Sequence, residues 1–351
     1  MNKEPQKVAV AMSGGVDSSV AAALLQKEGY ETIGVFMKFW KDGKEGVNKC
    51  CSSDSERNAR LTCQKLGIPF YVFNFEKEFK KEVVDYFLKT TIGGDTPNPC
   101  VVCNEKIKFG LFLEKSLKLG ADFIATGHYA KKKEFNEKGK IRFSLLKGKD
   151  KKKDQSYFLW ALGQKELKHM IFPVGIYTKD KVKKMAEDFK LPSSGAKESM
   201  EVCFISDTID AFLERKIGKK EGDIVYNNKA IGKHKGVWLY TLGQRKGIGL
   251  SNGPYYVIKK DIKSNILFVG KNKKLLNKSK AVIKKVNWVS GKKPKFPLKV
   301  TVMSRYNQKS FVSVVNENSV VFNSQKTSIT PGQSMVFYKG QELLGGGIIK
   351  N

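Results

Sequence analysis

The chain has 351 residues, 40% of them hydrophobic, and its 65 Lys and Arg against 34 Asp and Glu give a net charge of +31. This length can bury a sizeable core, and two or three domains are the natural expectation. No apolar run approaches the roughly 20 residues that cross a bilayer, and a strand begins too early for a leader peptide, so we expect a cytoplasmic protein without membrane association. The charge favours a nucleic-acid partner, although a lysine-rich source composition would also produce it.

Residues 8–18 read Val-Ala-Val-Ala-Met-Ser-Gly-Gly-Val-Asp-Ser. The pattern predicts a buried strand over 8–12, a glycine turn, and an alanine-rich helix over 17–28. Backbone N–H groups and the positive end of the helix dipole converge at such a turn, which therefore suits a phosphate. No Gly-Lys-Ser/Thr follows, as a Walker loop requires, and the spacing is not that of a dinucleotide fingerprint.

The N-terminal region alternates strands and helices. Strands are predicted at 8–12, 32–39, 70–75 and 123–126, and helices at 17–28, 53–66, 76–90 and 105–119. This alternation predicts an α/β fold with a doubly wound parallel sheet whose ligand lies at the carboxyl ends of the strands. Met37 and Thr126-Gly127-His128 follow strands at that edge. His128 is either a nucleotide neighbour or a residue that only bonds the backbone.

The remainder of the chain becomes rich in short strands. A hairpin is predicted around 141–146 and a helix over 179–190, and helical periodicity fades beyond Ile205. Turn signals over 222–275 indicate a small β-rich module, and alternation over 280–349 indicates an antiparallel β-barrel. We therefore expect three domains, over residues 1–206, 207–276 and 277–351.

Cysteines stand out in two stretches. In Thr96-Pro-Asn-Pro-Cys-Val-Val-Cys-Asn-Glu, Asn104 is a suitable N-cap for a helix beginning at 105, which would place Cys103 beside a helix N-terminus and favour its thiolate. Structural zinc, a redox dithiol and inert buried thiols are the alternatives at Cys100 and Cys103. Cys203 is predicted on a short apolar strand after a loop, where a buried thiol is commoner than a reactive one.

Together the motifs resemble one family. SGGVDS is similar to the pyrophosphate (PP) loop of the ATP pyrophosphatase superfamily. With TPNPCVVCNEKIKFG, ATGHY, KKDQSYFLW, ESMEVCFI, YTLGQRKGIGL, SRYNQ and PGQSMVFYKGQELLGGGII, in this order along nearly the whole chain, it resembles the bacterial tRNA-specific 2-thiouridylases. The resemblance implies that ATP, with Mg²⁺, adenylates the carbon-2 oxygen of the wobble uridine in tRNAs for Lys, Glu and Gln. Persulfide sulfur then replaces that oxygen, giving 2-thiouridine, AMP and pyrophosphate. A cysteine desulfurase or a sulfur-relay protein would supply the persulfide.

The resemblance also assigns residues. Cys103 would be the catalytic nucleophile and Cys203 the carrier of persulfide sulfur. The other implied contacts are with ATP (Ala11, Met12, Ser13, Gly14, Gly15, Val16, Asp17, Ser18, Met37, Gly127), the target base (Asn98, Pro99, Cys100) and tRNA (Lys153, Asp154, Gln155, Arg305, Tyr306).

Cys100 departs from the family pattern, since many members have an aspartate there that is proposed to assist proton transfer. A thiol is a poorer acid–base group, with an ordinary pKa of about 8.5. The change also creates a set of three thiols, Cys100, Cys103 and Cys203, that could hold an iron–sulfur cluster. Cys50, Cys51 and Cys63 match no motif.

Two other functions stay open from the sequence. One is another PP-loop enzyme that modifies tRNA or forms an amide, which would not need Cys103 and Cys203. The other is a non-catalytic RNA-binding protein that uses the basic β-rich domains. The basic, glycine-rich stretch 240–247 is either a tRNA contact or a turn between strands.

Overall fold

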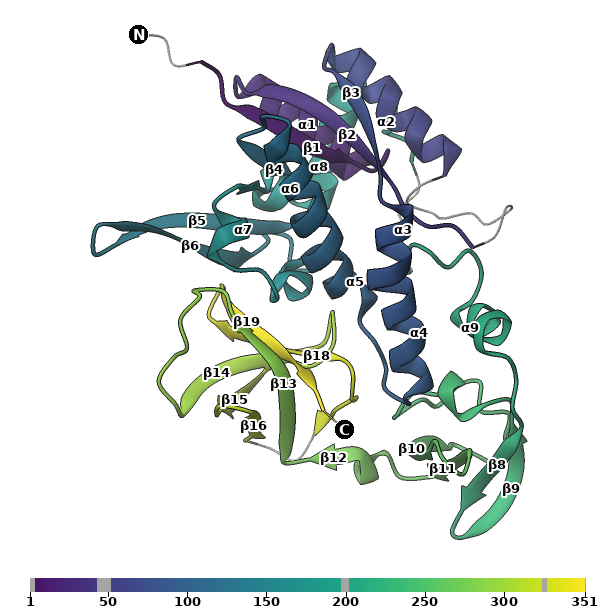
Figure 1. Cartoon of the computed structure of the whole chain (residues 1–351). Helices are drawn as coiled ribbons and strands as arrows, with labels where there is room; N and C mark the ends of the chain where they lie inside the picture. Colours follow the sequence, from purple (N-terminus) through teal and green to yellow (C-terminus); the bar gives the residue numbers. More distant parts are fainter. Residues whose placement is uncertain (1–3, 43–51, 197–201, 324–326, 351) are drawn as a thin grey trace.

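A five-stranded parallel sheet forms the centre of the N-terminal part (Figure 1). The computed structural model describes residues 4–42, 52–196, 202–323 and 327–350. The strand order is β3-β2-β1-β4-β7, with β1 (Lys7–Met12), β2 (Glu31–Lys38), β3 (Phe70–Asn74), β4 (Phe123–Ala125) and β7 (Met170–Ile171). Helices cover the sheet, and residues 8–11 of its central strand β1 are small or β-branched apolar residues that are buried. The predicted doubly wound sheet is confirmed, and only the two-residue β7 was not predicted.

The predicted helices are present, and one of them begins earlier than expected. Those that agree are α1 (Val16–Lys27), α2 (Ser53–Leu66), α8 (Lys179–Asp188) and a continuous helix over 76–92 formed by α3 (Glu76–Phe79), the π-helical η1 (Lys80–Val84) and α4 (Asp85–Ile92). A second continuous helix spans 99–118, as α5 (Pro99–Val102), the π-helical η2 (Cys103–Leu111) and α6 (Phe112–Lys118).

The predicted start of this second helix at residue 105 is wrong. Pro99 occupies the first helical position, where a fixed φ and a missing N–H are no disadvantage. Asn104 does not cap a helix; its side-chain amide instead donates to the carbonyl of Phe158 at 3.1 Å. Consequently Cys103 is buried inside the helix, and Cys100 is the exposed cysteine of the first turn.

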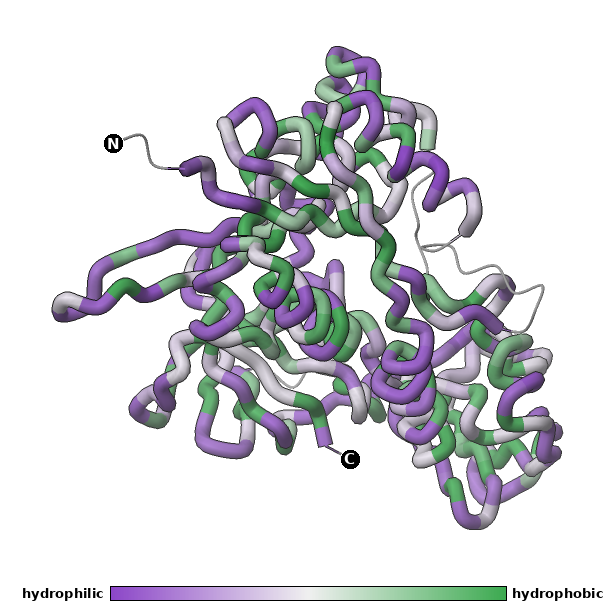
Figure 2. The backbone as a smooth tube through the Cα atoms, turned by 45° about the horizontal axis from the view of Figure 1, so that its top comes forward, coloured by the Kyte–Doolittle hydropathy of each residue, from purple (hydrophilic) through white to green (hydrophobic). Residues whose placement is uncertain are grey.

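A hairpin of β5 (Ala130–Glu137) and β6 (Lys140–Lys147) projects from the N-terminal part and is hydrophilic along much of its length (Figure 2). β6 pairs with β19 (Glu342–Ile349), so the hairpin extends the C-terminal sheet. The predicted hairpin is confirmed and is longer than expected. Short elements then lead to α8: η3 (Ser156–Leu159), α7 (Gln164–Leu167) and η4 (Pro173–Ile176).

The central module opens with a helix that was not predicted, α9 (Ile209–Ile217). Its four-stranded sheet has the order β10-β11-β8-β9, from β8 (Gly222–Tyr226), β9 (Lys229–His234), β10 (Tyr256–Asp261) and β11 (Ile266–Gly270), with the short helices η5 (Val237–Leu239) and η6 (Lys273–Leu276). Asn227 and Asn228 have positive φ and make the predicted turn between β8 and β9. The module has its own small core around Ile224, Val257 and Leu267.

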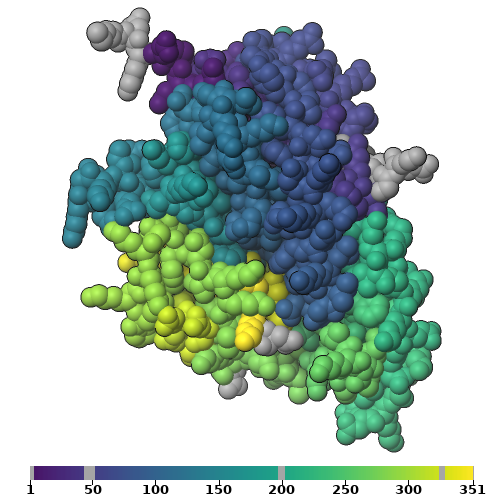
Figure 3. Space-filling view, in the orientation of Figure 1, coloured from purple at the N-terminus to yellow at the C-terminus, as the bar shows by residue number. Residues whose placement is uncertain are grey.

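The C-terminal part is the predicted antiparallel barrel. Its strands are β13 (Lys280–Trp288), β14 (Leu298–Met303), β15 (Phe311–Val315), β16 (Ser319–Phe322), β18 (Ser334–Lys339) and β19. They follow the order β13-β16-β15-β14-β18-β19, and pairing of β13 with β19 closes the barrel. A two-strand ladder of β12 (Asn277–Lys278) and β17 (Thr327–Ser328) lies beside it. The three parts occupy separate regions of the molecular surface (Figure 3).

We also find that no helix in the described ranges has both the length and the apolar composition needed to cross a membrane.

Candidate functional site

The Ser-Gly-Gly turn between β1 and α1 leads directly into the N-terminus of the helix, where the sequence predicts an anion site. Gly15 occupies the N-cap position of α1 with an extended backbone, and no side chain caps the helix. Ser18 Oγ accepts from the backbone N–H of Ser13 at 3.1 Å and so holds the turn closed. Gly14 has φ +74°, and a Cβ there would overlap the carbonyl oxygen of Ser55 on α2. The first N–H groups of α1 therefore face an opening that a phosphate suits.

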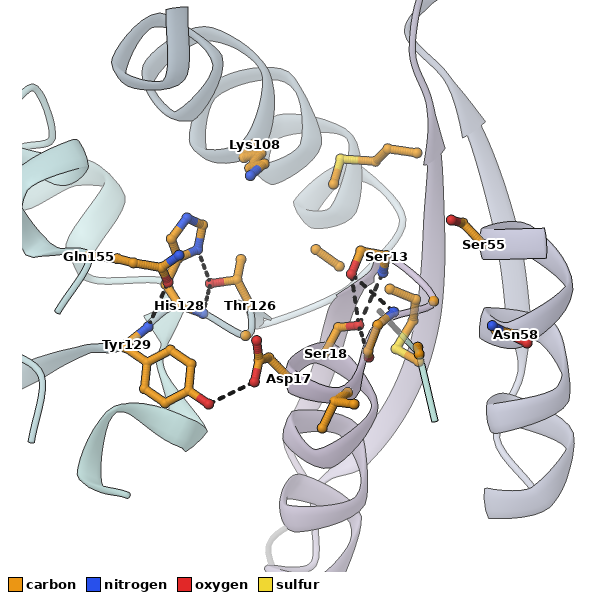
Figure 4. Close-up of a pocket in the computed structure, with 18 of the residues that line it drawn as sticks. Ser13, Asp17, Ser18, Ser55, Asn58, Lys108, Thr126, His128, Tyr129 and Gln155 are labelled. Atoms are coloured by element: carbon orange, nitrogen blue, oxygen red, sulfur yellow. Dashed lines mark hydrogen bonds between the residues drawn. The ribbon is translucent and has the colours of Figure 1, made fainter. Parts of the chain in front are cut away.

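This turn lines a cavity of about 540 Å³ at the carboxyl ends of the strands (Figure 4). The volume lies within the range of small-molecule sites. All ten residues predicted to contact ATP line it, namely Ala11, Met12, Ser13, Gly14, Gly15, Val16, Asp17, Ser18, Met37 and Gly127. Three segments thus meet at one edge of the sheet: residues 8–18, the end of β2 and the loop after β4.

Gly127 lies directly against the first turn of α1. A Cβ at this position would stand 2.8 Å from the carbonyl carbon of Asp17 and from the backbone nitrogen of Ser18. Only glycine lets the loop after β4 come this close to the anion site.

Lys179 and Tyr129 also reach this site, and the sequence did not predict them. The ammonium of Lys179, at the start of α8, lies 2.7 and 2.8 Å from the two carboxylate oxygens of Asp17. The phenol of Tyr129 donates to Asp17 Oδ1 at 2.7 Å. Only 8% of the Lys179 side chain is exposed, against 32% for Asp17. Lys108 of the 99–118 helix lines the cavity as well. Asp17 and Lys179 are 162 positions apart in the sequence, and no local pattern relates the two.

His128 forms part of the cavity wall and bonds a side chain. Its Nδ1 lies 2.8 Å from Thr126 Oγ1, and its ring packs against Phe109 and Phe172. Burial, with the positive charge of Lys108 as a smaller cause, holds the pKa of His128 well below its usual range. The imidazole is therefore neutral at pH 7. The ring lines the cavity and this hydrogen bond joins it to a side chain rather than to the backbone, so its place beside a nucleotide stays a prediction.

The predicted tRNA residues Lys153, Asp154 and Gln155 lie between the cavity and the barrel. Lys153 and Gln155 line the cavity, and Gln155 Oε1 accepts from the backbone N–H of Tyr129 at 3.0 Å. Asp154 Oδ1 accepts from the backbone N–H groups of Gly148 and Ser156, which fixes the loop.

The other predicted tRNA pair, Arg305 and Tyr306, lies across from this loop. Burial raises the pKa of the Tyr306 phenol, and the charges of Asp154 and Cys100 raise it further. Its ring packs on Phe158, with centroids 4.5 Å apart. The guanidinium of Arg305 donates to the carbonyl of Leu242 and to the hydroxyl of Thr330, so it links the central module to the barrel.

The segment predicted to contact the target base is held by all three parts of the chain. Gln333 of the barrel donates to the carbonyls of Thr96 and Pro97 at 3.0 and 3.1 Å, and Thr241 of the central module accepts from the Thr96 hydroxyl at 3.4 Å. Asn98 and Pro99 are buried beyond this clamp, and Cys100 is exposed. Cys100 lies near enough to Tyr306 for its charge to be one of the smaller causes that raise the pKa of the phenol.

Both proposed catalytic cysteines are supported by the 76–92 helix. The helical segment around Cys103 packs against η1, and Phe204, next to Cys203, packs edge-on against Phe79 and Phe87. Phe79 in turn stacks on Phe39, which lines the cavity, with centroids 4.7 Å apart. Two ring contacts, Phe204 to Phe79 and Phe79 to Phe39, therefore connect the residue next to Cys203 with the cavity wall. The strand predicted for it is wrong, because Val202–Ile205 is a turn closed by the Ile205 N–H to Val202 carbonyl bond.

The remaining cysteine expectations resolve differently. Cys63 is completely buried, and burial raises the pKa of its thiol to about 11, which makes it an inert core residue. Cys50 and Cys51 lie outside the described residues. Within the described part of the chain, no group of three or more His, Cys, Asp or Glu side chains could hold a metal ion. The structure therefore gives no support to an iron–sulfur cluster on Cys100, Cys103 and Cys203.

Comparison with known proteins finds close relatives. Family models match over residues 6–207 (tRNA methyl transferase HUP domain), 210–271 (tRNA methyl transferase PRC-barrel domain) and 278–349 (Aminomethyltransferase beta-barrel domain). A protein of Halothermothrix orenii named tRNA-specific 2-thiouridylase MnmA is 44% identical, with 98% of this chain and 99% of that protein covered. Relatives of the same name from Geobacillus thermodenitrificans and Clostridioides difficile are each 42% identical, covering 99% and 100% of this chain and 96% and 99% of their own lengths.

Proposed function

This chain belongs to the tRNA-specific 2-thiouridylase family, and we propose that it replaces the carbon-2 oxygen of the wobble uridine in tRNAs for Lys, Glu and Gln with sulfur. The observation that carries the proposal is the single cavity that collects all ten predicted ATP contacts and is linked to both cysteine segments. In the reaction the base oxygen attacks the α-phosphate of ATP and pyrophosphate leaves. The oxygen is thereby converted into the leaving group AMP.

The cavity suits the first step. Uncapped N–H groups of α1 and the hydroxyls of Ser13 and Ser18 would hold the departing pyrophosphate, where negative charge develops. Lys179, Lys108 and Lys153 surround the same space and add positive charge. Since the ring of His128 is neutral, the positive charge opposite the phosphates would come from these lysines.

Carboxylates of this cavity would hold the Mg²⁺ that accompanies ATP. Asp17 and Asp54 both line the cavity, and Mg²⁺ is commonly held by one or two carboxylates together with substrate phosphates and water. The ion would neutralise phosphate charge while the residues around it orient the nucleotide.

The cysteines suit the second step. The terminal sulfur of a persulfide on Cys203 would attack carbon 2, and AMP would leave with the original oxygen. The thiolate of Cys103 would then attack the Cys203 sulfur, forming a disulfide and leaving the sulfur on uridine as 2-thiouridine. An external thiol must reduce that disulfide before the next turnover. Burial of Cys103 in its helix would protect the thiol from bulk oxidants.

The base itself would enter beside Asn98, Pro99 and Cys100. Enzymes that act on a base take it out of its stack, and a rigid rim suits such a pocket. Here Gln333 and Thr241 provide the rigidity by fixing the segment just before these residues. Arg305, Tyr306 and the Lys153–Gln155 loop lie beside it and would contact the tRNA. An exposed thiol at Cys100 would touch the base without the acid–base role of a carboxylate.

The test is thiolation of unmodified tRNA by the purified protein with ATP, Mg²⁺, cysteine and a cysteine desulfurase. 2-Thiouridine is seen as retarded migration in a mercury-containing gel, and AMP is measured in parallel. Asp17→Ala should abolish AMP formation. Cys203→Ala and Cys103→Ser should abolish thiolation but leave some adenylation, whereas Cys63→Ala, a buried thiol outside the cavity, should keep both activities.

Each alternative predicts a different result. AMP formation with no retarded tRNA, and no effect of the two cysteine substitutions, would indicate another PP-loop enzyme. Binding of tRNA without any AMP would indicate a non-catalytic RNA-binding protein. Methyl transfer, which the titles of two family models name, would leave migration in the mercury gel unchanged.

A further inference from the structure

A second hollow, of about 200 Å³, lies in the loop between η5 and β10 of the central module. Its lining residues are Arg245, Gly247, Ile248, Gly249, Leu250, Gly253, Pro254 and Tyr255. None of these eight is acidic. The volume is below the roughly 300 Å³ at which sites for free small molecules begin, so the hollow fits one part of a larger ligand better than a whole small one.

The loop around the hollow is built to hold its shape. The N–H of Gly243 donates to the carbonyl of Val257 at 2.8 Å, and the N–H of Val257 donates to the carbonyl of Gln244 at 3.0 Å. The side chain of Gln244 accepts from the N–H of Thr241 and donates to the carbonyl of Lys246, so it closes the loop on both sides of Arg245. A preorganised loop loses little conformational entropy when it binds a ligand.

Two side chains of the hollow carry recognition chemistry. Arg245 is exposed and, within the described chain, has no hydrogen bond or ion pair of its side chain, whereas Arg215 binds both Asp42 and Asp207. The Tyr255 ring packs edge-on against Tyr226 at 5.5 Å and lies 5.4 Å from the ammonium of Lys271, which fixes its orientation. A guanidinium binds phosphate with two parallel hydrogen bonds, and an aromatic ring stacks on a base.

The loop that forms the hollow is tied by hydrogen bonds to the base-contact segment and to Arg305. This loop begins at Thr241, which is hydrogen-bonded to Thr96, and continues through Leu242, whose carbonyl accepts from Arg305. A nucleic acid that places one base beside Cys100 and its backbone beside Arg305 would lie next to the loop that carries Arg245.

We propose that this hollow binds a nucleotide of the tRNA flanking the target uridine, with its phosphate on the guanidinium of Arg245 and its base or ribose against Tyr255. The proposal rests on the proposed function. For residues 240–247, which the sequence left as either a tRNA contact or a turn between strands, it favours a tRNA contact at a specific subsite. The ligand is polymeric RNA, so inorganic phosphate and AMP should not occupy the hollow at millimolar concentration.

The test measures binding of fluorescently labelled, unmodified tRNA to the full-length protein by anisotropy at several salt concentrations. Arg245→Ala should weaken binding about tenfold, the size expected for one charge-assisted contact, and should lower the slope of log K against log salt by about one. Tyr255→Ala should weaken binding by a similar factor without changing the salt slope, and Tyr255→Phe should bind as wild type.

Lys246→Ala is the matched control. It removes the same charge from the adjacent exposed residue, which does not line the hollow, and should weaken binding less than about threefold. Equal losses of tRNA affinity for Arg245→Ala and Lys246→Ala would overturn the proposal and indicate long-range electrostatic attraction instead. Wild-type tRNA affinity of both Arg245→Ala and Tyr255→Ala would also overturn it. Thermal unfolding and ATP affinity of each variant check that it is folded. If the wild-type protein binds no tRNA, the proposed function itself fails, which is a separate outcome.

Discussion

Replacing Lys179 by Met should separate nucleotide binding from simple helix packing. The substitution removes the ammonium that lies 2.7 Å from Asp17 Oδ1 in the nucleotide cavity, while the unbranched side chain of methionine keeps most of the apolar volume. Asp17 would keep its hydrogen bond from Tyr129. We therefore expect the fold to persist and the phosphate site to lose one positive charge.

The expected magnitudes follow from burial. Loss of one partner from a fully buried ion pair costs about 3–5 kcal/mol, but Asp17 is about a third exposed and keeps Tyr129, so we expect about 1–2 kcal/mol of unfolding free energy. A charge-assisted hydrogen bond to phosphate contributes about 1.5–3 kcal/mol, or about 10- to 150-fold in ATP affinity. With ATP at 100 times the wild-type Kd, a 30-fold weaker variant would gain only about 0.9 kcal/mol from the ligand instead of about 2.7.

The assay is thermal and urea unfolding of both proteins with and without Mg·ATP, together with direct titration of ATP. Lys184→Met makes the same change at an exposed position of α8 and should alter neither quantity. If Lys179→Met unfolds more easily but shows the wild-type ATP affinity and ligand stabilisation, the Asp17–Lys179 pair only fastens α8 to α1. The phosphate role would then be refuted.

Three further results are expected. Gly127→Ala should reduce AMP formation by about 10- to 100-fold, because its Cβ would push the loop after β4 and the first turn of α1 apart by about 0.6 Å. The control Gly93→Ala should be active, since a Cβ there meets nothing closer than 3.4 Å. Equal rates of AMP formation by the two variants would contradict the close approach of Gly127 to α1. Gly34→Ala should destabilise by about 1–3 kcal/mol because its Cβ overlaps the Cys63 sulfur, and a double-mutant cycle with Cys63→Ala should recover much of this loss; purely additive effects would refute the contact. Between pH 9 and 11 the unfolded Cys63 thiol ionises before the buried one, so the folded state binds more protons and wild-type stability should fall by about 2–3 kcal/mol more than that of Cys63→Ala in urea unfolding.

Local patterns predicted most of the fold. The alternation of strand and helix over the first 130 residues, and the short strands near the C-terminus, depend on neighbours a few positions apart, which a sequence displays directly. Helix α9 was missed although Thr208 caps it and Phe212 and Leu213 recur on its buried face, so that signal was present. The pairing of β6 with β19 had no local signal, because it joins residues almost 200 positions apart.

The candidate site divides in the same way. Its glycine turn was predictable because one short segment supplies the turn, the hydroxyls and the helix N-terminus. Lys179 and Tyr129 reach Asp17 through tertiary packing of α8 and of the loop after β4, which no spacing in the sequence encodes. The helix start was mistaken for a related reason. Asn104 has the chemistry of an N-cap, but the carbonyl of Phe158, in the distant helix η3, accepts from its amide, and Pro99 begins the helix instead.

That shift of the helix start matters for the chemistry, because it exchanges the environments of the two neighbouring cysteines. Cys100 is exposed in the first turn, whereas Cys103 is buried one turn further along the same helix. Lys108, five residues beyond Cys103 on the same helix, lines the cavity. One helix therefore spans from the expected position of the base to the expected position of the phosphates, with the proposed nucleophile between them. In this arrangement groups on one continuous helix would hold the target base, the Cys103 thiolate that releases the sulfur, and the phosphates of ATP, while the persulfide on Cys203 would come from a separate turn.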